Sequence, residues 1–475
     1  MSTDASNAPL VSSAGEVRVR LPFITTSFAE NLWTYALLWP VWWALGIEQF
    51  LLPFFMLFEM VRFLAAANWR VRLNSTALLA LILALWWAVP ILWVDREFLD
   101  LFLRETATIW AQAFMLILFW NRIRTRRDWR LAVRALLLMA AYTAAAGLIY
   151  VSGFWRGSFL SLAGRVLPSS IIANSSFFSS IAIREFGSMA NEVGLLTQRL
   201  MAFSLSFSAL SMIALLLIPI VYWRFQVLRG PARLFYGGVA IGLVLCLFFT
   251  ESRISYAAFM AAIVLYVILR LGLLRGSNRP LTVALSLAAV ALALVAGYVL
   301  VETIMQSVQA AFVDLRPGSW LVRIQVYVAT LQLLPEHLIA GWGVPVRLPD
   351  MPSDYSAGTH SSYLGILFQH GIIGLLLYIA IWLSVWRSVI RGLSQRHVSR
   401  ELALYWIAAA TSFFAFNVRE IADSWLFDQS LTFVVWLMWG VALTAARCAD
   451  ADNNTMTTTS PDGQPVAVPA GEFPS

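Results

Sequence analysis

Histidine and arginine side chains are the residues of this sequence that could perform acid–base or phosphate chemistry. His360 follows the flexible stretch Ser-Ala-Gly-Thr (356–359) and stands directly before an apolar run. An imidazole with an unperturbed pKa of about 6.5 can act as a neutral base near physiological pH. The alternative is an interfacial histidine that only hydrogen-bonds a loop carbonyl, and the residue type leaves both interpretations open.

Two arginines stand in positions suited to binding phosphate. Arg253 lies in FFTESRISYAAF (248–259), where two apolar runs meet, and Arg323 lies in a stretch of mixed polar and apolar residues. A guanidinium group binds phosphate oxygens through two parallel donors and stays charged. Each arginine could instead snorkel or form an ion pair, and Glu251 is the nearest candidate partner of Arg253.

Three further residues are weaker candidates for the same site. Arg199 lies within the apolar run 193–223, where a charge is a functional hypothesis by default, although it could pair with Glu192. Arg184 lies in a long outer loop predicted at about 154–192. His337 follows a Pro-Glu pair and could simply cap a helix end.

The elements that must position these side chains are membrane helices. Of the 475 residues, 60% are hydrophobic and 12% are charged, whereas soluble domains average about 25% charged residues. A span needs about 20 mostly apolar residues. We therefore predict an all-α polytopic membrane protein with about twelve transmembrane helices, at 32–47, 50–67, 75–94, 105–121, 131–153, 193–223, 235–250, 254–271, 281–302, 362–386, 402–417 and 428–446.

The positions of the basic residues predict the orientation. All 33 are arginine, and with a cytoplasmic N-terminus 22 of them fall on the cytoplasmic side, mostly in short loops, as the positive-inside rule requires. Both termini are then cytoplasmic, and Arg253, Arg323 and His360 share the opposite face. The sequence has no basic patch interleaved with aromatic residues, so we expect no nucleic acid partner.

The chain divides into a membrane domain and two tails. Residues 1–30 and 447–475 are polar and are predicted to be disordered cytoplasmic tails, and 31–446 form the transmembrane domain. Within it, 303–361 is predicted to be a large periplasmic helical loop, because 319–343 has the mixed faces typical of an interfacial helix. The two cysteines show no disulfide or metal-site spacing. We expect no cofactor.

One base and two phosphate-binding arginines on the same outer face suit a specific reaction. A sugar held on a membrane lipid through a diphosphate needs its leaving group neutralised, and the acceptor hydroxyl needs a base. A nucleotide is not expected to be available on that face, and the sequence contains no P-loop.

Three segments resemble the O-antigen ligase/polymerase superfamily, which comprises bacterial membrane glycosyltransferases of the GT-C type. TESR (250–253) resembles the family's Ser-Arg pair at the mouth of a span. SWLVRIQVYVATLQLLPEHLIAGWG (319–343) resembles its pattern of arginine, aromatic residue, proline and Gly-x-Gly. THSSYLGILFQHGIIGLLLYI (359–379) resembles its His-Asn-x-x-Leu followed by Gly-x-x-Gly. Ser361 stands where the family often has asparagine, which removes an amide that could orient the imidazole.

The resemblance implies transfer of a glycan from an undecaprenyl-diphosphate carrier to an acceptor hydroxyl, of lipid A core or similar, at the periplasmic face of the bacterial inner membrane. It gives His360 the role of base, and it gives Arg253 and Arg323 the diphosphate. Inversion at the anomeric carbon and independence from metal follow by analogy. Two alternatives stay open: an O-antigen or exopolysaccharide polymerase of the same superfamily, and a transporter or flippase of lipid-linked glycan, which would need no base.

Overall fold

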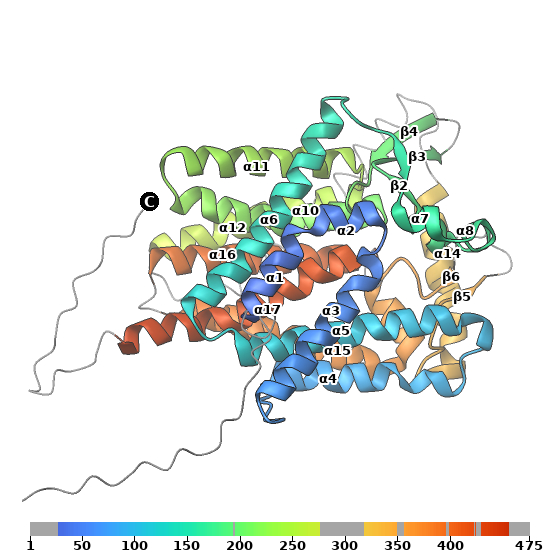
Figure 1. Cartoon of the computed structure of the whole chain (residues 1–475), viewed down its shortest axis with the longest axis horizontal. Coiled ribbons are helices and arrows are strands. Elements are labelled where there is room, and N and C mark those ends of the chain that lie inside the picture. Colours follow the sequence, from blue (N-terminus) through green and yellow to red (C-terminus); the bar gives the residue numbers. More distant parts are fainter. Residues whose placement is uncertain are drawn as a thin grey trace, which may run out of the picture.

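The computed structural model describes a bundle of long helices with short elements gathered at one end (Figure 1). The described residues are 27–192, 195–275, 318–348, 356–395, 399–421, 423 and 429–455. Among them, ten helical segments are long and apolar enough to cross a membrane: Glu48–Ala66, Ser75–Leu92, Arg96–Arg122, Arg126–Val151, Phe207–Val227, Gly230–Phe249, Ile254–Gly272, Ser362–Ser394, Arg400–Glu420 and Ser430–Cys448. The prediction of an all-α polytopic membrane protein is confirmed.

The helices have the following bounds along the chain: α1 (Phe28–Leu37), α2 (Trp39–Leu45), α3 (Glu48–Ala66), α4 (Ser75–Trp87), α5 (Leu99–Arg122), α6 (Arg126–Val151), α7 (Leu162–Val166), α8 (Ser169–Asn174), α9 (Ser176–Ala182), α10 (Phe207–Val227), α11 (Gly230–Phe249), α12 (Arg253–Arg275), α14 (Gly318–Leu333), α15 (Ser362–Ser394), α16 (Arg400–Glu420) and α17 (Gln429–Thr455). Short 3-10 turns cover Val89–Leu92, Arg96–Phe98 and Leu334–His337.

The helices α10, α16 and α17 form the centre of the bundle. Most of their residues are buried, and α10 packs against α6, α11, α16 and α17. Helices that are apolar all round belong in the interior of a large bundle or in lipid. By contrast, α4, α11 and α12 are mostly uncovered along their apolar sides, as expected for helices that face lipid.

Two of the twelve predicted spans are not among these ten. The run 32–47 folds as α1 and α2, which meet at Leu38, and Pro40 stands in the first turn of α2. Proline lacks the N–H that would continue a preceding helix, so each piece remains too short to span. The run 281–302 lies outside the described residues.

The prediction of one span over 193–223 is wrong for its first part. Residues Leu195–Leu200 form strand β4, which pairs with β3 (Gly187–Glu192) in an antiparallel hairpin, and helix α10 begins only at Phe207. An apolar run of this length does not distinguish a strand followed by a helix from a single helix.

The remaining strands also pair in twos at the same end of the bundle (Figure 1). Strand β1 (Ser158–Leu160) pairs with β2 (Ile183–Glu185), and β5 (Val346–Arg347) pairs with β6 (Ser356–Ala357), both antiparallel. The described parts of the two predicted long loops, at 154–192 and 303–361, therefore form short strands and helices that share one end of the bundle.

Helix α15 is interrupted at Gly371, where φ is 67° and ψ is −172°. This backbone conformation is essentially restricted to glycine. The loop 338–343 docks against the interruption through three backbone hydrogen bonds: Trp342 N to Phe368 O (2.9 Å), Gly343 N to Gln369 O (2.7 Å) and Ile372 N to Leu338 O (2.9 Å). The loop thereby satisfies backbone groups that the broken helix leaves open.

The predicted tails fall mostly outside the described residues. Within the described part, α1 already begins at Phe28, and α17 continues past residue 446 to Thr455.

Candidate functional site

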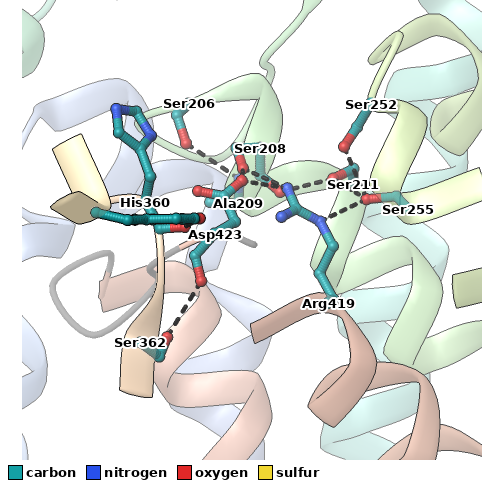
Figure 2. Close-up of polar contacts among 11 residues, drawn as sticks. Ser206, Ser208, Ala209, Ser211, Ser252, Ser255, His360, Ser362, Arg419 and Asp423 are labelled. Atoms are coloured by element: carbon teal, nitrogen blue, oxygen red, sulfur yellow. Dashed lines mark hydrogen bonds and ion pairs between the residues drawn. The ribbon is translucent and has the colours of Figure 1, made fainter. Parts of the chain in front are cut away.

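Arg419, in the last turn of α16, joins the ends of three helices. Its Nε donates to Ser255 Oγ on α12 (2.7 Å), and its Nη2 donates to Ser208 Oγ on α10 (2.5 Å). The guanidinium is almost fully buried. Figure 2 shows the guanidinium pointing from α16 toward the serines of the other two helices. A buried charge of this kind is tolerated only when it is paired and hydrogen-bonded.

Asp423 supplies the opposite charge, four residues after Arg419. Its carboxylate forms an ion pair with Arg419 and accepts a hydrogen bond from Ser208 Oγ. Its backbone carbonyl accepts from Ser362 Oγ in the first turn of α15 (3.3 Å). The segment after α16 is thus tied to both α10 and α15.

Three serines extend this network toward the turn between α11 and α12. The pairs Ser211–Ser255 and Ser252–Ser255 are joined by hydroxyl hydrogen bonds of 2.8 and 2.9 Å. Ser252 immediately precedes Arg253, the first residue of α12. The predicted turn between two spans, residues 250–252, is confirmed, and this network connects it to Arg419.

His360 has a left-handed backbone conformation, with φ of 63°. Such a conformation is uncommon for a residue other than glycine and is often found at functional sites. Two contacts from α14 hold the backbone at 358–360: Tyr327 Oη donates to the His360 carbonyl (2.7 Å), and Thr330 Oγ1 accepts from the amide of Gly358 (3.0 Å). The predicted large loop therefore fixes the backbone on which the imidazole stands.

Ser361 caps the N-terminus of α15. Its backbone is extended, and its hydroxyl accepts from the amide of Leu364 (3.4 Å). Serine and asparagine are about equally good in this position. The serine in place of the family's asparagine thus preserves the helix start that directly follows His360.

Burial and charge set the protonation state of the imidazole. Burial lowers the pKa of His360 below its usual 6.5, the positive charge of Arg323 lowers it further, and the negative charge of Asp423 opposes the shift. The imidazole is therefore neutral at neutral pH, which is the state that a general base requires.

Asp423 stays ionised in the same surroundings. Burial alone would raise the pKa of Asp423, but Arg419, the hydrogen bond from Ser208 and the charge of Arg323 together hold it below its usual value. A fixed negative charge is therefore present near the imidazole. In Figure 2, Asp423 lies between Arg419 and His360.

Arg323 is the predicted phosphate-binding residue that the structure brings to this cluster most clearly. It lies on α14, one turn before Tyr327, and its charge acts on His360, Tyr327, Asp423 and Arg419.

For Arg253, the structure describes the backbone position at the start of α12 but not the side chain. That backbone position adjoins the serine network.

The three weaker candidates lie in separate surroundings. Arg199 forms an ion pair with Glu251 (3.4 Å) and stacks over the ring of Phe207, so it contacts the edge of the same region. Arg184 forms a buried ion pair with Glu48 (2.5 Å). His337 stands against two tryptophan rings, those of Trp93 and Trp342.

Sequence reasoning missed Arg419, Asp423 and their serine partners. The predicted span ended at residue 417, so the following polar residues were read only as its boundary. A signal was present, because Arg419 and Asp423 stand four residues apart, the spacing at which two helical side chains meet. The serines of α10 and α12 gave no comparable signal, since their meeting depends on how three distant helices pack.

The fold and this cluster define a polytopic membrane protein with a buried charged site at one end of its helix bundle. Residues 238–379 match the family model described as O-Antigen ligase, so this part of the chain is similar to an O-antigen ligase domain. The resemblance predicted from three segments is confirmed, and Arg253, Arg323 and His360 all lie within the matched residues. The match supports an enzyme of the ligase or polymerase type that transfers lipid-linked glycans. A search of curated proteins finds no match to the chain.

Proposed function

We propose that the protein transfers a glycan from an undecaprenyl-diphosphate carrier to an acceptor hydroxyl, of lipid A core or a similar molecule. The observation that carries this proposal is the position of His360, which combines a strained backbone, a lowered pKa and charged neighbours of both signs. This arrangement suits a base that must be neutral before the reaction and cationic during it.

In the proposed mechanism, His360 accepts the proton of the acceptor hydroxyl. The acceptor oxygen forms a bond to the anomeric carbon, while the bond from that carbon to the phosphate oxygen breaks and undecaprenyl diphosphate leaves. Attack from the face opposite the leaving group inverts the anomeric configuration. Arg323 and Arg253 stabilise the charge that develops on the diphosphate.

Asp423 has a complementary role in this mechanism. It opposes the lowering of the His360 pKa, so its charge becomes more favourable as the imidazole gains a proton. The ion pair with Arg419 and the hydrogen bond from Ser208 keep the carboxylate ionised and in place. We assign Asp423 as a positioning and electrostatic residue, because it acts on the substrate through His360.

The distribution of charge supports a proposed orientation. The helix ends opposite the site carry arginines in short connections, and Arg126 and Arg224 both approach Glu401 there. Under the positive-inside rule that end faces the cytoplasm, so the proposed site faces the periplasm and both termini are cytoplasmic. The protein is then an inner-membrane enzyme that receives its donor lipid from the outer leaflet.

Deletion of the gene and electrophoresis of the cell's polysaccharides test this function. A ligase deletion leaves polymerised glycan that is no longer attached to its acceptor, whereas a polymerase deletion leaves single repeat units on the acceptor. Restoration by the wild-type gene is the control. An unchanged polysaccharide profile would contradict both forms of the proposal.

A transporter of lipid-linked glycan is the competing class, since it could use the same arginines to grip a diphosphate. It differs from the enzyme in needing no base. Glycan transfer by purified wild-type protein, with donor and acceptor in the same detergent solution, requires the enzyme and excludes a role in transport alone.

A further inference from the structure

We propose that a cavity beside the cluster binds a sugar unit of one of the two substrates. The cavity has a volume of about 250 Å³ and lies between α2, α9, strand β2 and the segment that leads into α10. Its lining residues are Trp43, Ser179, Ser180, Ile183, Arg184, Glu185, Met201, Ser204 and Leu205. The proposal rests on the proposed function, because it assigns part of the substrate to a place next to the same site.

The cavity is lined by Ser204 and Leu205, which lead directly into α10 and so toward Ser208 of the charged cluster. Ser204 donates a hydrogen bond to the carbonyl of Ser206 (2.7 Å), and Ser206 caps the start of α10 by accepting from the amide of Ala209. Ser208, in the first turn of α10, contacts Arg419 and Asp423. A few residues of one segment therefore separate the cavity wall from the charged cluster.

The charge of the lining argues against a second phosphate site. Arg184 is a cation, but Glu48 lies 2.5 Å away and both side chains are almost fully buried, so the pair is close to neutral. Glu185 adds a carboxylate to the lining. A diphosphate would meet a net negative surface in this cavity, which is electrostatically unfavourable.

The chemistry of the lining suits a neutral group that carries many hydroxyls. Ser179 can donate and accept, whereas Ser180 and Ser204 already donate to backbone carbonyls and can still accept. The Glu185 carboxylate is a further strong acceptor for hydroxyl donors. Trp43 is held rigidly against the rings of Phe159 and Phe203 and offers an apolar surface. A pyranose ring has both properties, hydroxyls at its edge and C–H groups on its faces. A lipid chain would leave the polar groups of this lining unsatisfied.

A neighbouring cavity provides a matched control. It is lined by Ser169, Ile172, Ala173, Ser175, Ser179 and Ile183, so it shares two residues with the first cavity but none of the charged ones. Ser169→Trp therefore adds the same indole to the neighbouring cavity. Ser180→Trp fills the proposed sugar cavity and leaves the backbone carbonyl that Arg184 uses.

The test measures binding of two probes to the purified full-length protein in detergent. One probe is undecaprenyl diphosphate without sugar, and the other is the lipid-linked glycan pool extracted from a strain that lacks this protein. If the cavity holds a sugar of the donor, Ser180→Trp and Glu185→Ala weaken binding of the glycan pool about tenfold or more and leave binding of undecaprenyl diphosphate unchanged. Ser169→Trp leaves both unchanged.

A second arm identifies an acceptor sugar. The envelope fraction of the same strain, solubilised and titrated as acceptor, gives an apparent KM for transfer. If the cavity holds the acceptor, Ser180→Trp and Glu185→Ala raise this KM about tenfold without changing donor binding. Unchanged donor binding and unchanged KM in both variants would overturn the sugar cavity. Failure of the wild-type protein to bind either probe would instead overturn the proposed function, and the sugar assignment with it.

Discussion

The phenol of Tyr327 donates a hydrogen bond of 2.7 Å to the backbone carbonyl of His360. This contact links the helix that carries Arg323 to the residue proposed as the base. Burial raises the pKa of Tyr327, so the phenol remains a donor at any pH at which the protein would work. This hydrogen bond therefore joins the helix that carries Arg323 to the backbone that carries the proposed base.

Tyr327→Phe tests this link. Loss of one hydrogen bond of this type costs about 0.5–1.5 kcal/mol, so kcat/KM should fall about two- to tenfold. Tyr142→Phe removes a similar phenol-to-carbonyl bond, to Leu37, away from the site and should leave the kinetics unchanged. Equal rates for both variants would show that the Tyr327 contact does not hold the base.

His360→Ala should abolish most glycan transfer. Removal of a general base costs about 10²–10⁴-fold in rate, while donor binding should persist because the arginines remain. His397→Ala, between the predicted spans 362–386 and 402–417 on the predicted cytoplasmic side, is the matched control and should transfer glycan normally. Near-normal transfer by His360→Ala in a purified assay would exclude the proposed mechanism.

The pH dependence of kcat/KM should respond in opposite directions to two charge changes. Activity falls as the pH drops through the pKa of His360, because protonation removes the base. Arg323 lowers this pKa, so Arg323→Gln should move the acidic limb of the profile to higher pH. Asp423 raises it, so Asp423→Asn should move the limb to lower pH.

The positions of these limbs can be compared even if both variants are slow. Shifts in the same direction, or no shift in either variant, would mean that His360 does not control the profile. Circular dichroism before each assay should establish that Asp423→Asn is folded, because the variant weakens the pairing of the buried Arg419.

Arg323→Lys should lower activity sharply although the charge is kept. A lysine cannot reproduce the two parallel donors with which an arginine grips a diphosphate. Binding of undecaprenyl diphosphate should weaken together with transfer. Arg347→Lys, an exposed position on β5, is the control and should bind as the wild type does. Full activity of Arg323→Lys would mean that the residue only snorkels.

Gly371→Ala should destabilise the protein and reduce transfer. A Cβ at this position would lie 2.0 Å from the carbonyl oxygen of Ile339, and the positive φ disfavours any side chain. Thermal unfolding in detergent should shift to lower temperature by several degrees. Gly238→Ala on α11 meets no atom within 4 Å and should be neutral. A wild-type melting temperature for Gly371→Ala would contradict the docked loop.

The sequence predicts the spans well because each is a local property of about 20 residues. The prediction fails where an apolar run is compatible with more than one structure. Pro40 divides one such run into α1 and α2, and the run from residue 193 begins as strand β4. His360 and Arg323 were identifiable because a base and a cation are chemically conspicuous beside apolar runs. Arg419 and Ser208 were not, since their meeting depends on the packing of α10 against α16, which no short stretch of sequence encodes.

The interruption at Gly371 divides α15 into a short helical segment, 362–370, and a long one, 372–394, joined by a single residue. The short segment directly follows His360 and Ser361, and backbone hydrogen bonds join it to loop 338–343. The long segment packs among the other membrane helices. Ser362 and the His370 carbonyl also bond the short segment to Asp423 and to Trp86 of α4, so a displacement of the loop would act on the base and on the bundle together.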